Sequence, residues 1–443
     1  MPDSRETYLT LDLALRVGEV LLSSGAGAAD VTATMLSITH ACGLRNCEVD
    51  VTFTSLALSY QPGPDQPSHS QMRSVRHRAI DYSRLTDVDL MVRGLLSGEI
   101  DRDEARTRLA SIVSAGHRYP WIATTIGWGF MGMGASITIG GDWIVTLIAF
   151  VAAVGVDRIM RALERQRLPS FYQQVAGGLF ATLLAVGVAS TQIRVDPSLV
   201  VTASIIMLLS GVASMGAVQD ALTGYYVTSA ARALEAMLLT AGIIAGVSGG
   251  IAIANKAVVG VAYSSVAGGL SVLPLLLFGA GLTAGAFAFA LHAPVRALVP
   301  IALVAVLGEL AFKLVLLQDF GRTYGSAAAA IVIGVVSYAV AGRVRVPPLV
   351  VVVSSVVPLL PGLSIYRGLF QVIDGQTHGL ISLVTAGAIA VAIASGVILG
   401  EYVAQPLKRE ARRLEARLAG PRLVGPFRAR QPKRDRDRDR NRG

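Results

Sequence analysis

Charged residues and cysteines are both scarce in this sequence. Asp, Glu, Lys and Arg make up 16% of its 443 residues, while 53% are hydrophobic. Soluble domains usually carry about 25% charged residues, so this composition is typical of a membrane protein. The two cysteines, Cys42 and Cys47, are too few for a four-cysteine metal cluster, and the six histidines lack zinc-ligand spacing. We therefore expect two reduced thiols, no metal site and no cofactor.

Outside its C-terminal tail the chain carries no net charge. The net charge is +9, and residues 403–443 alone carry 14 Lys/Arg and 5 Asp/Glu. The basic balance thus describes a tail, not a nucleic-acid-binding surface. Such a tail is either a solvated, disordered end or a segment attracted to anionic lipid on the cytoplasmic leaflet. The first twenty residues contain no long apolar segment, so no signal peptide is expected.

Residues 1–119 predict a small α/β domain. Asp101 is placed to cap the last of its helices, with Glu104 three residues later. Helical periodicity, β-branched segments and turn residues predict the elements. In chain order they are a helix over 11–43 interrupted at 23–27, strands over 49–58 and 71–77, and helices over 85–96 and 102–113.

From Pro120 the sequence becomes strongly apolar. Most of the apolar segments approach the roughly 20 residues that cross a bilayer, and backbone hydrogen bonding requires them to be helices. Ten such segments place both termini on one side, and the basic tail and loops place that side in the cytoplasm. The predicted spans are 121–139, 143–160, 171–190, 198–216, 230–252, 268–290, 296–316, 324–341, 347–364 and 379–402.

The two halves of this region resemble each other. Leu208–Gly211 matches Leu359–Gly362, and Gly224 matches Gly375, both at an offset of 151 residues. A repeat of five helices is odd in number, so its second copy would enter the membrane from the opposite side. Inverted repeats are typical of alternating-access transporters. The predicted domains are therefore 1–119, the two repeats 120–256 and 257–402, and the tail 403–443.

Polar residues near the fourth span are the first candidates for a substrate site. Gln219 and Asp220 follow this span, and Gly211 and Gly224 could interrupt the helix on either side of them. Charge inside a membrane is expensive and is therefore a functional hypothesis. Asp220 would bind a substrate ammonium or a coupling proton. The alternative is a carboxylate in a loop at the cytoplasmic boundary.

Spans seven and nine supply further candidates. Glu309 and Lys313 are four residues apart, so they either pair with each other or carry a proton relay. Pro358, Pro361 and Gly362 break span nine, which either lines a binding site or simply kinks the helix. In span five, Arg232 and Glu235 lie close enough in sequence to pair.

One sequence motif raises the possibility of an enzyme. Residues 246–250, GVSGG, fit the G-x-S-x-G pattern of a hydrolase nucleophile. Here Ser248 lies inside an apolar span, and His292 at the end of span six is the only histidine near a similar depth. Close helix packing explains the glycines better, so we do not expect an enzyme.

Three segments before the apolar region carry the pattern of a known family: residues 18–31, GEVLLSSGAGAADV, residues 49–55, VDVTFTS, and the segment from Arg84 to Ala105. They are similar to the opening helix, the strand and the paired helices before the membrane of the threonine/serine exporter family, which the chain resembles over residues 10–402. Family members often carry Pro-Gly in the fourth span, where this chain has Ser210–Gly211.

This resemblance implies a cytosolic N-terminal domain, ten membrane helices in two five-helix halves, and export of threonine and serine driven by the proton motive force. The expected partners are an amino-acid substrate, protons and the lipids of the plasma membrane. Two alternatives remain open: an exporter of another small metabolite or dipeptide, and a sensor or hydrolase that uses the N-terminal domain. Assembly into a homo-oligomer is also left open.

Overall fold

The computed structural model is mostly helical. The chain divides after Ala404 into one compact unit and a separate C-terminal segment. The described residues are 4–75, 80–191, 197–206, 208, 211–256, 272–361, 364, 368, 371–372 and 375–418.

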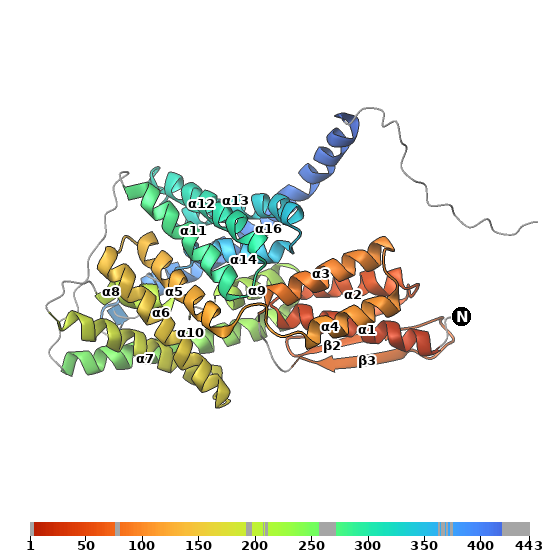
Figure 1. Ribbon diagram of the computed structural model, residues 1–443, viewed down its shortest axis with the longest axis horizontal. Coiled ribbons are helices and arrows are strands. Elements are labelled where there is room, and N and C mark those ends of the chain that lie inside the picture. The colour runs from red at the N-terminus through yellow and green to blue at the C-terminus, as the bar shows by residue number, and fades with distance from the viewer. Residues whose placement is uncertain are drawn as a thin grey trace, which may run out of the picture. The chain divides into compact units, whose positions relative to one another are not determined.

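The N-terminal domain, residues 4–114, combines four helices with a three-stranded antiparallel sheet of order β1-β2-β3 (Figure 1). Its core is formed by apolar side chains from α1, α2 and α3 together with those of β2, such as Leu56 and Leu58. The elements are α1 Ser4–Ser23, α2 Ala28–Ala41, β1 Cys47–Val51, β2 Ser55–Tyr60, β3 His69–Ser74, α3 Tyr82–Ser97 and α4 Arg102–Ser114.

Several predictions for this domain are confirmed. The predicted interruption at 23–27 separates α1 from α2. The Asp101 side chain caps α4 by accepting a hydrogen bond of 2.7 Å from the backbone N–H of Glu104, as the capping signal indicated. The strand predicted at 71–77 is β3, although His77 lies outside the described residues.

The single strand predicted over 49–58 is wrong. The segment forms two strands, β1 and β2, that pair with Val51 opposite Leu56. The reversal at Thr52 is closed by hydrogen bonds to Ser55, from the Thr52 backbone N–H at 2.9 Å and between the two hydroxyls at 2.7 Å. Threonine and serine hydroxyls compete with strand pairing in this way. The β-branched composition of the segment hid the turn.

The helices described after α4 are arranged in two halves. In the first half they are α5 Trp121–Thr138, α6 Trp143–Arg165, α7 Ser170–Ala189, α8 Pro197–Ile205, α9 Gly211–Leu222 and α10 Tyr226–Lys256. In the second half they are α11 Leu273–Ala290, α12 Val295–Leu316, α13 Gly321–Val344, α14 Pro348–Val356, the 3₁₀ turn η2 Val357–Leu359 and α16 His378–Leu418.

Seven of these helices are long and apolar enough to cross a membrane: α6, α7, α10, α11, α12, α13 and α16. Their lengths agree with the roughly 20 residues that a bilayer requires. The chain is therefore a helical multi-pass membrane protein. The predicted span 121–139 forms α5, and the fourth and ninth predicted spans are each divided.

The division of these two spans falls at the predicted positions. In the fourth, α8 ends at Ile205 and α9 begins at Gly211. In the ninth, α14 ends at Val356, and η2 leads to Pro361. Proline at the second position of η2 cannot continue an α-helical ladder, because it lacks the backbone N–H. Gly362, predicted to take part in this break, lies outside the described residues.

The two halves share a turn geometry at matching places. Gly224 and Gly375 both have positive φ, 91° and 74°. At Gly224 the backbone N–H of Tyr225 bonds to Asp220 O at 2.8 Å, and at Gly375 that of Gln376 bonds to Gln371 O at 2.8 Å. Both are helix ends of the Schellman type, which favours glycine at the left-handed position. The 151-residue offset seen in the sequence thus relates two identical backbone turns.

The halves also share a glycine-mediated helix pairing. In the first half, α7 packs on α10 so closely that a Cβ on Gly242 would lie 2.7 Å from Phe171 O. In the second half, α13 packs on α16, and a Cβ on Gly396 would lie 2.7 Å from Ala327 O. Small residues let helix backbones approach in this way. In each half, the third helix and the last helix therefore form a tight pair.

Candidate functional site at the end of α9

The last turn of α9 buries a carboxylate against a guanidinium. Asp220 is fully buried, and its Oδ2 lies 3.1 Å from Nε of Arg232 on α10, whose side chain is 4% exposed. The Schellman turn at Gly224 reverses the chain between α9 and α10, which brings the two residues together. Asp220 therefore lies in the last turn of α9 and inside the protein.

Both charged groups also bond to the N-terminal domain. Oδ1 of Asp220 accepts a hydrogen bond of 2.8 Å from the backbone N–H of Ala28, and Nη2 of Arg232 donates one of 2.6 Å to Ala26 O. Ala28 is the first residue of α2, and Gly27 at the N-cap has no side chain to cap it. Asp220 therefore caps α2 from 192 residues away in sequence, where a negative charge is favoured by the helix dipole.

Neighbouring groups enclose this pair. Gln219 lies beside the α1–α2 turn, since a Cβ on Gly27 would be 3.2 Å from its Nε2. Just beyond α9, the Tyr225 hydroxyl bonds to the Thr32 hydroxyl at 3.0 Å. Thr228 Oγ1 donates to Val51 O at 3.1 Å. The end of α9 and the start of α10 thus form the surface that contacts the N-terminal domain.

Of the predicted site residues, Asp220, Gln219 and Gly224 meet at this end of α9, and Gly211 begins the same helix. The others lie on different elements. Glu309 and Lys313 form an ion pair of 3.4 Å on α12, with Glu309 buried and the Lys313 side chain 27% exposed. Pro361 is half-buried beyond η2.

Two buried pairs were missed by the sequence analysis. The sequence spacing suggested an ion pair between Arg232 and Glu235, but the Arg232 guanidinium pairs with Asp220. Asp157 at the end of the second span is also buried, with Oδ2 2.9 Å from Nε of Arg161 and 2.6 Å from the Thr125 hydroxyl. A spacing of four residues on α6 could have revealed the second pair. No local signal could have revealed the first.

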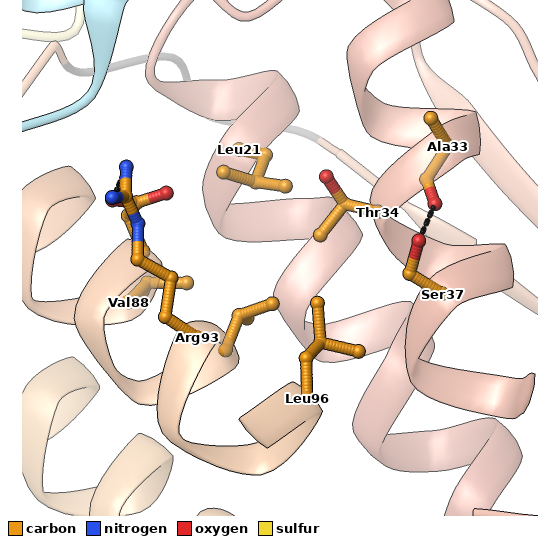
Figure 2. Close-up of a pocket in the computed structure, with 9 residues that line it drawn as sticks. Leu21, Ala33, Thr34, Ser37, Val88, Arg93 and Leu96 are labelled. Atoms are coloured by element: carbon orange, nitrogen blue, oxygen red, sulfur yellow. Dashed lines mark hydrogen bonds and ion pairs between the residues drawn. The ribbon is translucent and has the colours of Figure 1, made fainter. Parts of the chain in front are cut away.

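A separate cavity of about 220 Å³ lies within the N-terminal domain (Figure 2). Its wall is mainly apolar, and Figure 2 shows Leu21, Val88 and Leu96 around it, with Thr34 from α2 and Arg93 from α3. Arg93 pairs with Asp89 at 2.8 Å. Burial raises the pKa of the Asp89 carboxyl, and Arg93 opposes that rise only in part. The cavity is small and mostly apolar, with one ion pair at its wall.

Comparison with known proteins bears on the role of these features. Residues 12–254 match the family described as "Putative threonine/serine exporter", and residues 276–403 match the family described as "Threonine/Serine exporter, ThrE". A "Probable threonine/serine exporter" of Mycobacterium tuberculosis is 37% identical over 95% of this chain and 81% of its own length. A "Threonine/serine exporter" of Corynebacterium glutamicum is 31% identical over 93% of this chain and 86% of its own length. No solved structure matches the chain.

Proposed function

The chain belongs to the threonine/serine exporter family, and from that premise we propose that it exports threonine and serine across the plasma membrane, driven by the proton motive force. It is an exporter and not an enzyme. The observation that carries the substrate proposal is the buried Asp220–Arg232 pair at the end of α9. A zwitterionic amino acid needs an anion for its ammonium and a cation or amides for its carboxylate. This pair offers both within one site.

In this conformation the side chains of Asp220 and Arg232 both bond to the protein's own backbone. The N–H of Ala28 donates to Asp220 where a substrate ammonium would bind, and the C=O of Ala26 accepts a hydrogen bond from Arg232. Because Asp220 is fully buried, substrate reaches it only when the α1–α2 turn withdraws. We therefore interpret this conformation as a closed state. Gln219 lies beside the same turn and would bond the substrate hydroxyl.

We propose that residues 120–256 and 257–402 form two inverted repeats of five helices. The matching turns at Gly224 and Gly375, the divided fourth helix of each half, and the shared pairing of third and last helices support this. Gly211 and Pro361–Gly362 would then mark equivalent breaks. Inverted halves can exchange conformations and so alternate access to a site between them.

We propose ten crossings, and the contacts of the N-terminal domain are compatible with that number. Three segments that contact this domain lie after predicted spans four and six and at the start of predicted span nine. The contacts are Tyr225 with Thr32, Leu291 O with the backbone N–H of Tyr82, and Leu349 with the domain's core. With ten crossings, every second loop returns to the side on which the chain began. We propose that this side is the cytoplasm, where the basic tail would meet anionic lipid.

Proton coupling is assigned to two candidates, Asp220 and the Glu309–Lys313 pair. Glu309 is a buried acid on α12 whose partner Lys313 is partly exposed. Ionisable groups inside membrane proteins commonly serve as proton relays. Lys313 compensates the Glu309 carboxylate when it is ionised, and the partly exposed Lys313 ammonium can be solvated when the carboxyl takes up a proton.

Radiolabelled threonine efflux from preloaded vesicles tests the proposal, measured with and without an uncoupler. We expect efflux that collapses when the uncoupler is added. Asp220→Asn should abolish export while the protein stays in the membrane, because the amide cannot neutralise the substrate ammonium. Uncoupler-insensitive efflux would refute proton coupling, and unchanged export by Asp220→Asn would remove Asp220 from the mechanism.

The control for this variant is the double variant Asp220→Asn/Arg232→Gln. Removing one partner of a buried ion pair typically costs about 3–5 kcal/mol, because a charge is left buried without compensation. If Asp220 only neutralised Arg232, the double variant would recover export. If Asp220 binds substrate, the double variant stays inactive even though its thermal stability returns toward that of the wild type. Competition with serine, other amino acids and dipeptides defines the substrate range.

A further inference from the structure

Three groups with metal-ligating atoms meet where the N-terminal domain joins the helices. Asp81, His117 and His292 each offer one ligand atom, and all three atoms lie within 4.8 Å of one another. They come from three separate segments: the N-cap of α3, the linker between α4 and α5, and the loop between α11 and α12. None of them belongs to the Asp220 site. The cluster therefore calls for an explanation of its own.

Asp81 is held in place by its own helix. Its Oδ1 accepts hydrogen bonds from the backbone N–H of Ser83 at 3.0 Å, the Ser83 hydroxyl at 2.7 Å and the backbone N–H of Arg84 at 3.1 Å. Its Oδ2 faces Nδ1 of His117 at 3.0 Å. One oxygen is thus fixed by the cap, and the other is presented to the cluster from a side chain that is only 4% exposed.

The two histidines face each other across the junction. Their rings stack with centroids 4.8 Å apart. His292 is half-buried and has a positive φ of 65°, which its place in the tight loop after α11 imposes. Its Nδ1 accepts a long hydrogen bond of 3.3 Å from the backbone N–H of Tyr119. His117 is 62% exposed, so its ring can turn toward an ion without repacking the protein.

We propose that Asp81, His117 and His292 form a binding site for a divalent transition metal, with Zn²⁺ as its natural occupant. Two imidazoles and one carboxylate are a common ligand set for zinc, with water as the fourth ligand. Zn–N and Zn–O bonds of about 2.0–2.2 Å place ligand atoms about 3.4 Å apart in a tetrahedron. The 3.0 Å between Asp81 and His117 is already close to this separation.

Rotation of the exposed His117 ring and displacement of the long Tyr119 bond complete the site. The ion then replaces the proton shared by Asp81 and His117. It also ties α3 and the linker to the α11–α12 loop, next to the hydrogen bond of 2.9 Å from the Tyr82 N–H to Leu291 O. Zinc therefore fastens the N-terminal domain to the second half of the helices, away from the Asp220–Arg232 contact with the first half.

Metal titration of the full-length protein tests the site directly. The protein is purified in detergent without a polyhistidine tag, stripped with a chelator, and titrated with Zn²⁺ by calorimetry and with Co²⁺ by visible absorption. We expect one Zn²⁺ per chain and Co²⁺ bands of a tetrahedral site. His117→Ala and His292→Ala should each weaken binding at least about 10–100-fold, the loss seen even when a supporting residue of a metal site is removed.

The matched control is His40→Ala, which removes an exposed histidine on α2 outside the cluster and should leave binding unchanged. Asp81→Asn also disturbs the cap of α3, so the decisive variant is His117→Ala, whose side chain is the most exposed of the three. Absence of stoichiometric binding by the wild type would overturn the proposal. Wild-type affinity in both histidine variants would overturn it as well, since the ion would then be held elsewhere.

Discussion

At the scale of single residues, buried charge occurs in pairs. Each of three buried carboxylates faces a basic residue: Asp220 with Arg232, Asp157 with Arg161, and Glu309 with Lys313. Isolated charges are costly in a membrane interior, and pairing is the common solution. Only the first pair joins two helices and also bonds to the N-terminal domain. This distinguishes it from the two pairs that lie within a single helix.

For Glu309 we predict that Glu309→Gln makes threonine efflux insensitive to the imposed proton gradient while transport down a threonine gradient persists. An amide cannot take up or release a proton at this place. The control is Glu309→Gln/Lys313→Met, which removes both charges of the pair. If Glu309 only neutralises Lys313, the double variant recovers efflux that responds to the proton gradient, and the proton-relay hypothesis fails.

At the scale of elements, local signals located most of the boundaries correctly. The α1–α2 interruption, the Asp101 cap and the division of the fourth and ninth spans each follow from residues at the break itself. The β1–β2 turn was not predicted, because Thr52, Phe53 and Thr54 are common strand residues. The turn there depends on hydroxyl bonds between Thr52 and Ser55, which composition does not encode.

The G-x-S-x-G motif offers a test of helix packing. A Cβ on Gly246 would contact Val175 O and lie 2.8 Å from Leu179 N, whereas a Cβ on Gly249 would lie 3.9 Å from its nearest neighbour, a methyl of Leu179. We predict that Gly246→Ala lowers stability by about 1–3 kcal/mol through overpacking, while Gly249→Ala has little effect. Thermal unfolding in detergent measures both.

Ser248→Ala completes this comparison. Packing assigns no chemistry to the hydroxyl, so export by this variant should equal that of the wild type. If loss of the Ser248 hydroxyl stopped activity while Gly246→Ala was tolerated, the packing explanation of the motif would fail and a nucleophile would have to be considered.

At the scale of the whole molecule, the number of crossings decides the topology. Seven helices are long and apolar enough to span alone, and an odd number would place the termini on opposite sides. Ten crossings need α5 and the two divided helices as well, and they return the chain to its starting side. The N-terminal domain contacts made at Tyr225, Leu291 and Leu349 lie on the starting side under either count, so they do not choose between seven and ten.

Cysteine labelling distinguishes the two counts. With Cys42 and Cys47 replaced by serine, we predict that an impermeant maleimide added to intact cells labels Asp142→Cys and Asp319→Cys but not Glu164→Cys. If only the seven long helices cross, the loop that holds Asp142 would be internal and the loop that holds Glu164 would be external. Labelling at Glu164 but not at Asp142 would therefore contradict the ten-helix arrangement.

The sequence by itself determined the class of protein, the start of the apolar helices after Pro120, most helix ends and the family. Each of these depends on hydropathy, capping residues or motifs within a short window of chain. Only the tertiary structure decided that Asp220 is buried, that Arg232 is its partner and that both hold the start of α2. It likewise assembled Asp81, His117 and His292 into one cluster, where the sequence had predicted no metal site. These contacts join residues far apart in the chain, and no local pattern records which distant group a side chain will meet.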